Sequence, residues 1–224
     1  MLGKELGTFY LGVHTGEGVN FMAGTGVTGF EGSDRVESVT TDSGEKIESD
    51  LVVVGAGVLP RTSLAEGAGI ATDNGILTGA DLQTDSPGIY AAGDVANAWH
   101  PFYEQRVRVE HWANARRQGA AAGRAMAGDD VSYDEIPYFF SDQYEVGMEY
   151  VGFVTESDRI IYRGSVEERE FIAFWMNGDR VVAGMNVNVW DVSDTISDLI
   201  RSRTEVDTAK LTDSDVDLAS LLTG

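Results

Sequence analysis

Residues 84–100, "TDSPGIYAAGDVANAWH", decide the fold class, because they combine a turn, an apolar run and a carboxylate in one short segment. Asp85-Ser-Pro-Gly88 predicts a tight turn, and the apolar residues 89–92 predict a short strand. Gly93 and Asp94 follow that strand directly. Ligands of parallel α/β sheets bind beyond the carboxyl ends of the strands, so the segment indicates a ligand site. The plainer interpretation of Asp94 is a helix N-cap, and the pattern alone leaves both open.

The neighbouring segments extend the same pattern in both directions. Upstream, Asn74-Gly75 predicts a turn before a short strand, and "LVVVGAG" (51–57) is continuously apolar, as in a strand buried on both faces. That strand ends in Gly55 and Gly57, which either make a tight turn or let a ligand approach the backbone. Downstream, the Ala-rich residues 110–127 predict a long helix.

The first fifty residues contain a second glycine pattern. A helix is predicted over residues 3–13, and strands are predicted over 19–24, 35–41 and 45–57. Gly24, Gly26 and Gly29 have the spacing of a dinucleotide-binding fingerprint, but turn and strand residues follow them where the fingerprint needs a helix. We therefore interpret this spacing as coincidence, with loop geometry as its cause.

From about residue 131 the pattern becomes antiparallel. Strand-like runs occur near residues 145–154, 159–166, 170–178 and 180–189, with turns between them. Residues 191–203 predict a helix with Ser193 or Asp194 as its N-cap, and the leucine-containing tail predicts a short packed helix.

Composition excludes several classes of function. The chain has 224 residues, no cysteine, only three histidines, and 37 acidic against 16 basic residues, a net charge of −21. Structural disulfides, thiolate zinc sites and redox dithiols are absent, and the histidine spacing predicts no metal site. The negative field argues against nucleic acid and anionic membranes as partners. No run is long enough to span a bilayer and no secretory signal is recognisable, so a cytoplasmic protein is expected.

Residues 84–100 and 106–128 together resemble the second flavin-binding segment of flavoprotein pyridine-nucleotide reductases. The resemblance is greatest to the ferredoxin, putidaredoxin and rubredoxin reductases that serve oxygenases. "ESDLVVVGAGVLPRTSLAEGAGI" (48–70) is similar to the end of that family's NAD domain. "IPYFFSDQYEVGMEYVGF" (136–153) is similar to the start of its C-terminal domain.

The resemblance implies an α/β plus α+β fold with glutathione-reductase-like FAD- and NAD(P)-binding domains, both partial here. The implied divisions are a partial NAD(P)-binding domain at 1–78, the last segment of the FAD-binding domain at 79–130, and an antiparallel reductase C-terminal domain at 131–224. Family members begin with an FAD-binding Rossmann unit and a second glycine-rich unit. The chain is therefore expected to be part of a longer reductase, with poor FAD affinity and little activity by itself.

The resemblance also implies roles for individual residues. Asp94 would hold the ribityl chain of FAD, with backbone contacts from Gly93 and Val95. Glu110, His111 and Trp112 would line the pyrimidine end of the flavin, where the Trp112 amide would donate to a ring carbonyl. The remaining implied positions are Gly55 and Gly57, which would approach NAD, and Phe139-Phe140, which stands where relatives usually have a tryptophan and either packs on the ring or belongs to the core.

The implied chemistry is hydride transfer from NAD(P)H to FAD, then single electrons to a ferredoxin-type iron–sulfur protein. It requires no acid–base triad, so no catalytic side chain is expected. The alternatives are an NADH oxidase or nitrite-reductase-like flavoprotein, and a non-catalytic fragment with an empty FAD site. Oligomeric state stays open. Five arginines within 99–128 either form a docking patch for an acidic ferredoxin or belong to a solvated helix face: Arg106, Arg108, Arg116, Arg117 and Arg124.

Overall fold

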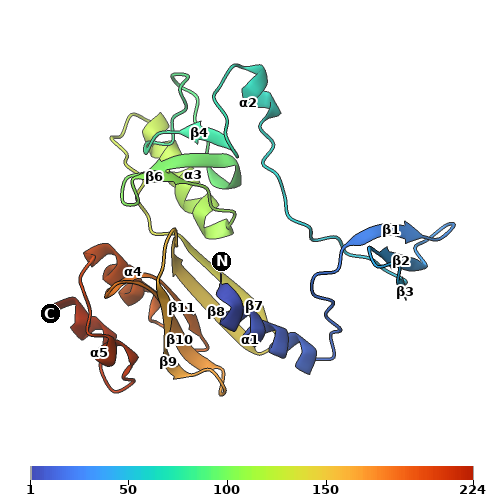
Figure 1. The fold of residues 1–224 in the computed structure, drawn as a ribbon. Coiled ribbons are helices and arrows are strands. Elements are labelled where there is room, and N and C mark those ends of the chain that lie inside the picture. The colour runs from blue at the N-terminus through green and yellow to red at the C-terminus, as the bar shows by residue number, and fades with distance from the viewer. Residues whose placement is uncertain (1, 224) are drawn as a thin grey trace. The chain divides into compact units, whose positions relative to one another are not determined.

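The computed structural model describes residues 2–223 and divides them into two compact units, residues 2–58 and 59–223, which we describe separately (Figure 1). The first unit contains helix α1 (Gly3–Gly16) and the strands β1 (Val27–Glu31), β2 (Ser38–Thr41) and β3 (Lys46–Glu48). The three strands form an antiparallel meander in the order β1-β2-β3. The predicted helix over 3–13 is therefore confirmed, and it extends to Gly16.

The glycine fingerprint is confirmed as a coincidence. Gly24 lies in a turn with φ of +68°, and Gly29 lies within β1, so no helix follows the glycines. The strand predicted over 19–24 is wrong, because these residues are irregular and the strand begins at Val27.

The strand predicted over 45–57 is correct only for its first residues, in β3. Residues 51–58 are irregular in the structure, with Leu51 79% and Val53 85% exposed. An apolar run forms a buried strand only between neighbouring strands, and the described residues place none beside it. The prediction of a buried strand at residues 51–57 is therefore wrong for the structure described here, although the run is continuously apolar.

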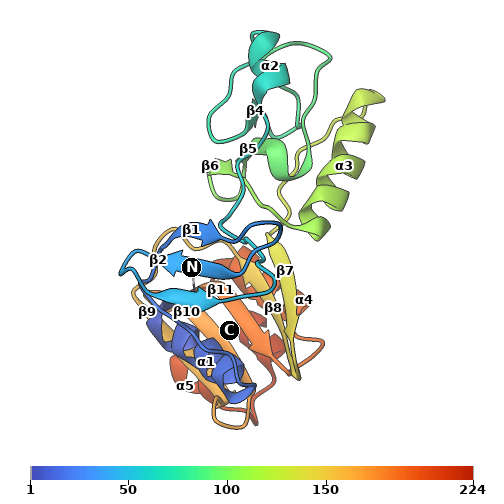
Figure 2. The ribbon, with the colours of Figure 1, turned by 90° about the vertical axis from the view of Figure 1, so that its right-hand side faces the viewer.

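The second unit begins with a small sheet and two helices, α2 and α3 (Figure 2). Its elements are α2 (Ser63–Gly67), β4 (Ile76–Thr78), the 3₁₀ turn η1 (Gly93–Val95), β5 (Ala96–His100), β6 (Gln105–Val107) and α3 (Trp112–Met126). The sheet has the order β4-β5-β6, with β4 and β5 parallel and β6 antiparallel. The turns at Asn74-Gly75 and Asp85–Gly88, the strand after Asn74-Gly75 and the Ala-rich helix are confirmed.

The strand predicted over 89–92 is wrong as a regular element. Tyr90 makes a single antiparallel bridge with Gln83, and the Ala91 amide donates to the Leu82 carbonyl at 3.1 Å. The regular strand begins only after the turn, at Ala96. Asp94 therefore follows an extended segment that is held by these backbone contacts and not by a regular strand pairing.

The rest of the second unit is an antiparallel sheet covered by helices. Its strands, in the order β7-β8-β11-β10-β9, are β7 (Tyr138–Gln143), β8 (Val146–Gly152), β9 (Arg159–Ser165), β10 (Glu170–Asn177) and β11 (Arg180–Val187). They are followed by α4 (Ser193–Ser202), α5 (Thr208–Thr212) and the 3₁₀ helix η2 (Leu218–Thr223). The mixed α/β and α+β class, the antiparallel sheet, the helix over 191–203 and the packed tail are all confirmed.

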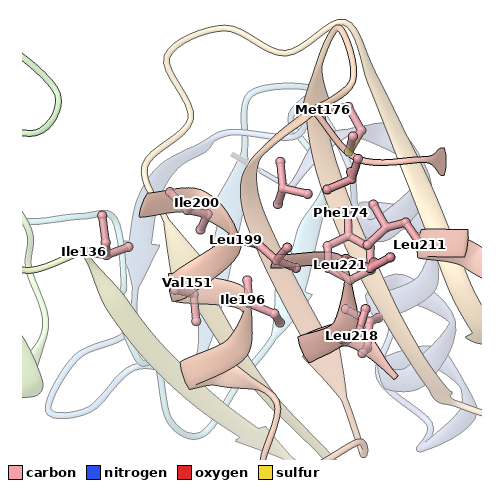
Figure 3. Close-up of a cluster of buried hydrophobic side chains, with 13 residues drawn as sticks. Ile136, Val151, Phe174, Met176, Ile196, Leu199, Ile200, Leu211, Leu218 and Leu221 are labelled. Atoms are coloured by element: carbon pink, nitrogen blue, oxygen red, sulfur yellow. The ribbon is translucent and has the colours of Figure 1, made fainter. Parts of the chain in front are cut away.

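The core of this sheet lies between its strands and the helices that follow them. Phe174 and Met176 of β10 are fully buried against Ile196 and Leu199 of α4 and against Leu211 of α5 (Figure 3). Alternate residues of the strands and one face of α4 supply this core, so the sequence period of each element is preserved.

The predicted N-cap of α4 is wrong. The N-cap position is Val192, which makes no side-chain capping bond. The Ser193 hydroxyl donates instead to Glu149 Oε2 at 2.7 Å, so tertiary contact outcompetes the local cap.

Candidate functional site

The turn that contains Asp94 is fixed against helix α3. Gly93 has φ of +77° and is buried, and its amide donates to Gln118 Oε1 at 2.8 Å. A Cβ at position 93 would lie 3.2 Å from the Cβ of Ala115, so glycine permits the close approach of turn and helix. Val95, half-buried, completes the turn. The result is a rigid base under an exposed carboxylate.

The side chain of Asp94 is exposed, and the described residues give its carboxylate no hydrogen-bond partner. Its backbone carbonyl accepts from Arg108 Nη1 at 3.0 Å. The same guanidinium group binds Glu110 Oε1 at 2.5 Å, so the Glu110 carboxylate is already paired. Of the two predicted acidic site residues, Asp94 is therefore the one available to accept bonds from a ligand.

The first turn of α3 adds a hydrogen-bond donor to this site. His111 is the N-cap, and its Nδ1 accepts from the Ala113 amide at 3.2 Å. Burial lowers the pKa of His111, while the nearby Asp94 charge opposes that effect. A neutral ring is what this cap requires. The Trp112 amide, at the first helical position, has no intrahelical acceptor and lies at the positive end of the helix dipole.

Aromatic side chains from β7 face His111. Its ring lies 5.3 Å from that of Phe140 and 6.4 Å from that of Tyr138, both edge-to-face. Phe139 stacks on Tyr150, with ring centroids 4.8 Å apart. Successive residues of a strand point to opposite faces, so half-buried Phe139 stacks on Tyr150 on one face of β7, while Phe140, 45% exposed, lies on the other. The His111 ring also lies 6.2 Å from that of Phe139, and which of the two phenylalanines would pack on a flavin ring stays a prediction.

This division predicts different effects of the two substitutions. Phe139→Ala should lower the free energy of unfolding by about 2 kcal/mol, because a half-buried ring is removed from its stack. Phe140→Ala should change it by less than about 0.5 kcal/mol, as is usual for an exposed residue. Urea unfolding of the two variants checks this difference, and equal losses would contradict the assignment.

A half-buried carboxylate ties this aromatic cluster to α4. Glu149 accepts hydrogen bonds from Tyr138 Oη at 2.6 Å, Ser193 Oγ at 2.7 Å and Asn186 Nδ2 at 3.0 Å. Burial raises the pKa of Glu149, but the three donors outweigh it and hold the pKa below its ordinary value. Strands β7, β8 and β11 and the start of α4 are thus joined at one point.

Glu149→Gln should lower the free energy of unfolding by about 1–2 kcal/mol at pH 7, because the charge-assisted bonds are lost. A lowered folded-state pKa stabilises the protein above the unfolded-state pKa, and this stabilisation is lost as the pH falls below about 4.3 towards the folded-state value. The variant should therefore differ from the parent at pH 7 and converge with it in acid.

The matched control is Glu145→Gln, which removes an exposed ion pair with Arg169. Its effect should stay below about 0.5 kcal/mol at any pH. Denaturant titrations between pH 3 and pH 7 compare the three proteins, and a pH-independent loss in Glu149→Gln would contradict the role of the charge.

The predicted arginine patch is smaller than the sequence indicated. Arg106 Nη1 donates to the carbonyls of Thr78 and Asn97, each at 2.9 Å, and Arg108 is held as described above. Arg116 and Arg117 are exposed on α3, where the Arg116 guanidinium lies 4.6 Å from the centre of the Trp112 ring. Arg106 therefore stabilises the sheet while its side chain stays exposed, and Arg108 stabilises the turn at Asp94. The other exposed arginines lie on α3: Arg116, Arg117 and Arg124.

The structure places the predicted site residues in two groups. Gly93, Asp94, Val95, Glu110, His111, Trp112 and Phe140 all belong to the unit 59–223, where the contacts above bring them together. Gly55 and Gly57 belong to the other unit. Gly57 has φ of +87°, but the described residues 51–60 form no turn, and a Cβ at either glycine would meet open space. Their approach to NAD stays a prediction.

Two buried polar residues that were not among the predicted positions shape the site. Gln118 holds the Gly93 amide, and Asn114 donates to the Val109 carbonyl at 3.1 Å and accepts from Tyr133 Oη at 3.2 Å. Both are on the buried face of α3 together with Ala121 and Ala122. Their spacing of four residues on the alanine side of the helix was the signal that could have identified them.

Residues 2–223 were also compared with the requirements of a metal site and of a membrane span. No group of three or more potential metal ligands comes together there. None of the described helices combines the length and apolar character needed to cross a membrane.

Comparisons with known proteins place this geometry in a family. Residues 1–119 match the family model described as pyridine nucleotide-disulphide oxidoreductase, and residues 138–222 match the model described as reductase C-terminal. The chain is 36% identical to putidaredoxin reductase CamA of Pseudomonas putida over 96% of its length and 51% of that protein. It is 33% identical to the ferredoxin–NAD(+) reductase component of the anthranilate 1,2-dioxygenase system of Burkholderia cepacia, covering 99% of this chain and 55% of that one.

Solved structures of similar fold lead to the same family. The ferredoxin reductase for the CYP199A2 system of Rhodopseudomonas palustris matches with a TM-score of 0.91 and 30% identity, over 97% of this chain and 54% of that chain. The chain thus spans about half the length of the relatives it matches. The first family model includes the turn with Asp94 and the start of α3, and the second includes the antiparallel sheet. The chain therefore belongs to the pyridine nucleotide-disulphide oxidoreductase family, with a reductase C-terminal domain of the kind found in ferredoxin reductases.

Proposed function

We propose that residues 1–224 form the flavin-ring and acceptor-facing half of an FAD-dependent reductase that passes electrons from NAD(P)H to a ferredoxin-type iron–sulfur protein of an oxygenase system. The observation that carries the proposal is the exposed carboxylate of Asp94, to which none of the described side chains or backbone groups bonds, on a turn fixed against α3 by the Gly93–Gln118 hydrogen bond. Relatives named as ferredoxin reductase components of oxygenase systems support it.

The side chains present fit a flavin better than a small anion. A carboxylate such as that of Asp94 accepts hydrogen bonds from the hydroxyls of a polyol chain. The unpaired Trp112 amide and the helix dipole favour negative charge on a ring edge placed near them. The half-exposed ring of Phe140 offers an apolar face beside His111. These groups together suit a polyol attached to a flat, electron-accepting ring.

When bound, the flavin would take a hydride from the nicotinamide and release electrons one at a time. The protein would bind and orient it: Asp94 holds the polyol, the Trp112 amide stabilises charge on the ring, and the neutral His111 keeps the first turn of α3 capped. No side chain needs to transfer a proton in this scheme. The division into domains at 78 and 130 and the cytoplasmic location belong to the same proposal.

A chimera tests the proposal directly. The remaining half of the Pseudomonas putida putidaredoxin reductase, fused ahead of residues 1–224, should bind FAD stoichiometrically and reduce a [2Fe–2S] ferredoxin with NADH or NADPH. A folded chimera without flavin absorbance would support a non-catalytic fragment. Faster reduction of oxygen or nitrite than of the ferredoxin would support the oxidase or nitrite-reductase alternative.

The exposed arginines of α3 lead to a prediction about the acceptor. Arg116→Glu with Arg117→Glu in the chimera should slow ferredoxin reduction about 10-fold or more at low salt, because steering of an acidic partner is lost. Reduction of ferricyanide, a small acceptor, should change much less. Stopped-flow measurements with both acceptors check this, and equal losses would contradict a docking role. A solved relative in covalent complex with putidaredoxin makes such a partner reasonable.

A further inference from the structure

His100, the last residue of β5, is a buried histidine that the proposed function does not use. It is 4% exposed, and its Nε2 lies 3.0 Å from the Glu135 carbonyl oxygen. Because a carbonyl oxygen only accepts hydrogen bonds, Nε2 carries the proton of the neutral ring and Nδ1 carries none. Nδ1 is also buried, and it bonds to none of the described residues. The site thus fits a neutral imidazole and provides no acceptor for a second ring proton.

The bond from His100 joins two parts of the second unit. His100 belongs to the β4-β5-β6 sheet, whereas Glu135 lies in the linker between α3 and β7. The residues on either side of Glu135 are attached to the antiparallel sheet and its helices. Arg201 of α4 donates to the Asp134 carbonyl at 2.8 Å, and Ile136 is buried in the sheet core (Figure 3). Loss of the bond between His100 and Glu135 would therefore weaken the contact between the two sheets.

The turn after β5, residues 101–104, makes further contacts that do not depend on pH near neutrality. Arg203 Nη2 donates to the Phe102 carbonyl at 2.5 Å, and the Tyr103 ring lies 4.7 Å from that of His100 and 5.7 Å from that of Phe153. Arginine stays charged in this range, and burial raises the pKa of Tyr103, which therefore stays neutral. Among these contacts, the one that changes charge between pH 5 and pH 8 is that of His100.

The charged groups around His100 come from the linker and from α4. Burial is the largest influence and lowers the pKa of His100, and Arg201 acts in the same direction. The bond to Glu135 and the carboxylates of Asp134 and Glu135 oppose burial without cancelling it. A pKa below the ordinary value of about 6.5 means that the buried ring is stabilised in its neutral form, so this stabilisation is lost progressively as the pH falls below about 6.5.

We propose that His100 is a pH-sensitive latch that holds the β4-β5-β6 sheet and α3 against the antiparallel sheet. The neutral ring fixes the linker through Glu135. A proton taken up from water at Nδ1 finds no acceptor in the buried site, so the charged ring moves towards solvent and the linker is released. The linker leads directly into β7, and its release changes the position of Phe140 relative to His111.

Two nitroxide labels on residues 1–224 test the latch. The chain has no cysteine, so Arg124→Cys on α3 and Asp198→Cys on α4 provide the two attachment sites, and both positions are exposed. The distribution of distances between the labels should be narrow at pH 7.5 and about two-fold broader at pH 5.5, because protonation populates released conformations. Its midpoint should coincide with the titration of the His100 ring followed by NMR, while far-UV circular dichroism stays constant.

A substitution at His100 separates the latch from other effects of acid. In His100→Gln, the side-chain amide donates to the Glu135 carbonyl and does not titrate, so the distribution should stay narrow at both pH values. His14→Gln is the matched control, because it removes a histidine of α1 in the other unit, and it should broaden as the parent does. If His100→Gln does not fold, the midpoint of the parent compared with the His100 titration decides the question.

The proposal is overturned if the parent has the same distribution at both pH values, or if His100→Gln broadens in acid as the parent does. It is also overturned if the midpoint differs from the titration of His100, or if secondary structure is lost over the same pH range. None of these measurements uses flavin, so the result is independent of whether the chimera binds FAD.

Discussion

Replacing Asp94 with alanine is expected to weaken FAD binding by about 10- to 100-fold in the fused chimera. A hydrogen bond to a charged group contributes about 1.5–3 kcal/mol, and each 1.4 kcal/mol is a factor of ten in affinity. The loss should be confined to binding, because the carboxylate makes no hydrogen bond to the described residues and the turn beneath it is held by Gly93, Gln118 and Arg108.

The measurement is the dissociation constant of FAD from apoprotein titrations followed by flavin fluorescence. Asp94→Asn keeps one acceptor oxygen without the charge and should give an intermediate value. Asp130→Ala removes an exposed carboxylate beyond the end of α3 and should bind FAD as the parent does. Equal affinities for the Asp94→Ala and Asp130→Ala proteins would remove Asp94 from the flavin site.

Helices and strands with periodically spaced apolar residues that pack in a nearby core were predictable from the sequence. Helix α3 buries one face, and alternate residues of β10 pack against α4 and α5 in the same unit. The position of Asp94 after an extended segment was predictable for a similar reason. Gly88 with φ of +79° and Gly93 with φ of +77° bracket that segment with turns that only glycine adopts easily.

Elements that depend on distant partners were not predictable in the same way. The sequence of residues 51–57 describes an interior strand, yet the described residues provide no neighbour to pair with it, so the segment is irregular. Ser193 is a good N-cap by local chemistry, but Glu149, 44 positions earlier, takes its hydroxyl. Both errors arise from contacts that a local pattern does not contain.

The flavin site stays a prediction, but the structure shows which of its residues lie together and what supports them. His111 lies beside Phe140, and the five arginines have two different roles. Arg106 and Arg108 were counted as surface charge, but they bond backbone carbonyls of β4, η1 and β5. A count of charges from the sequence does not show which arginines already bond backbone carbonyls.

Gly93→Ala and Gly119→Ala should change stability in opposite directions, although both replace glycine by alanine in the same part of the fold. At Gly93, a side chain at φ of +77° costs about 1–2 kcal/mol, and the Cβ would meet Ala115 at 3.2 Å, so a total loss of about 2 kcal/mol is expected. At Gly119, inside α3, a Cβ meets no atom within 4 Å, and alanine should add about 0.5–1 kcal/mol through its helix propensity.

Urea unfolding of residues 1–224 carrying either substitution gives the two stabilities. In the fused chimera, Gly93→Ala should also weaken FAD binding, because a shift of the turn breaks the bond from the Gly93 amide to Gln118 and displaces Asp94 from the start of α3. Gly119→Ala should leave FAD affinity unchanged, since residue 119 is exposed and its Cβ would meet no atom within 4 Å. If both variants kept the parent affinity while Gly93→Ala lost stability, the turn would serve the fold alone, and the flavin would have to be held by the His111–Trp112 end of the helix without it.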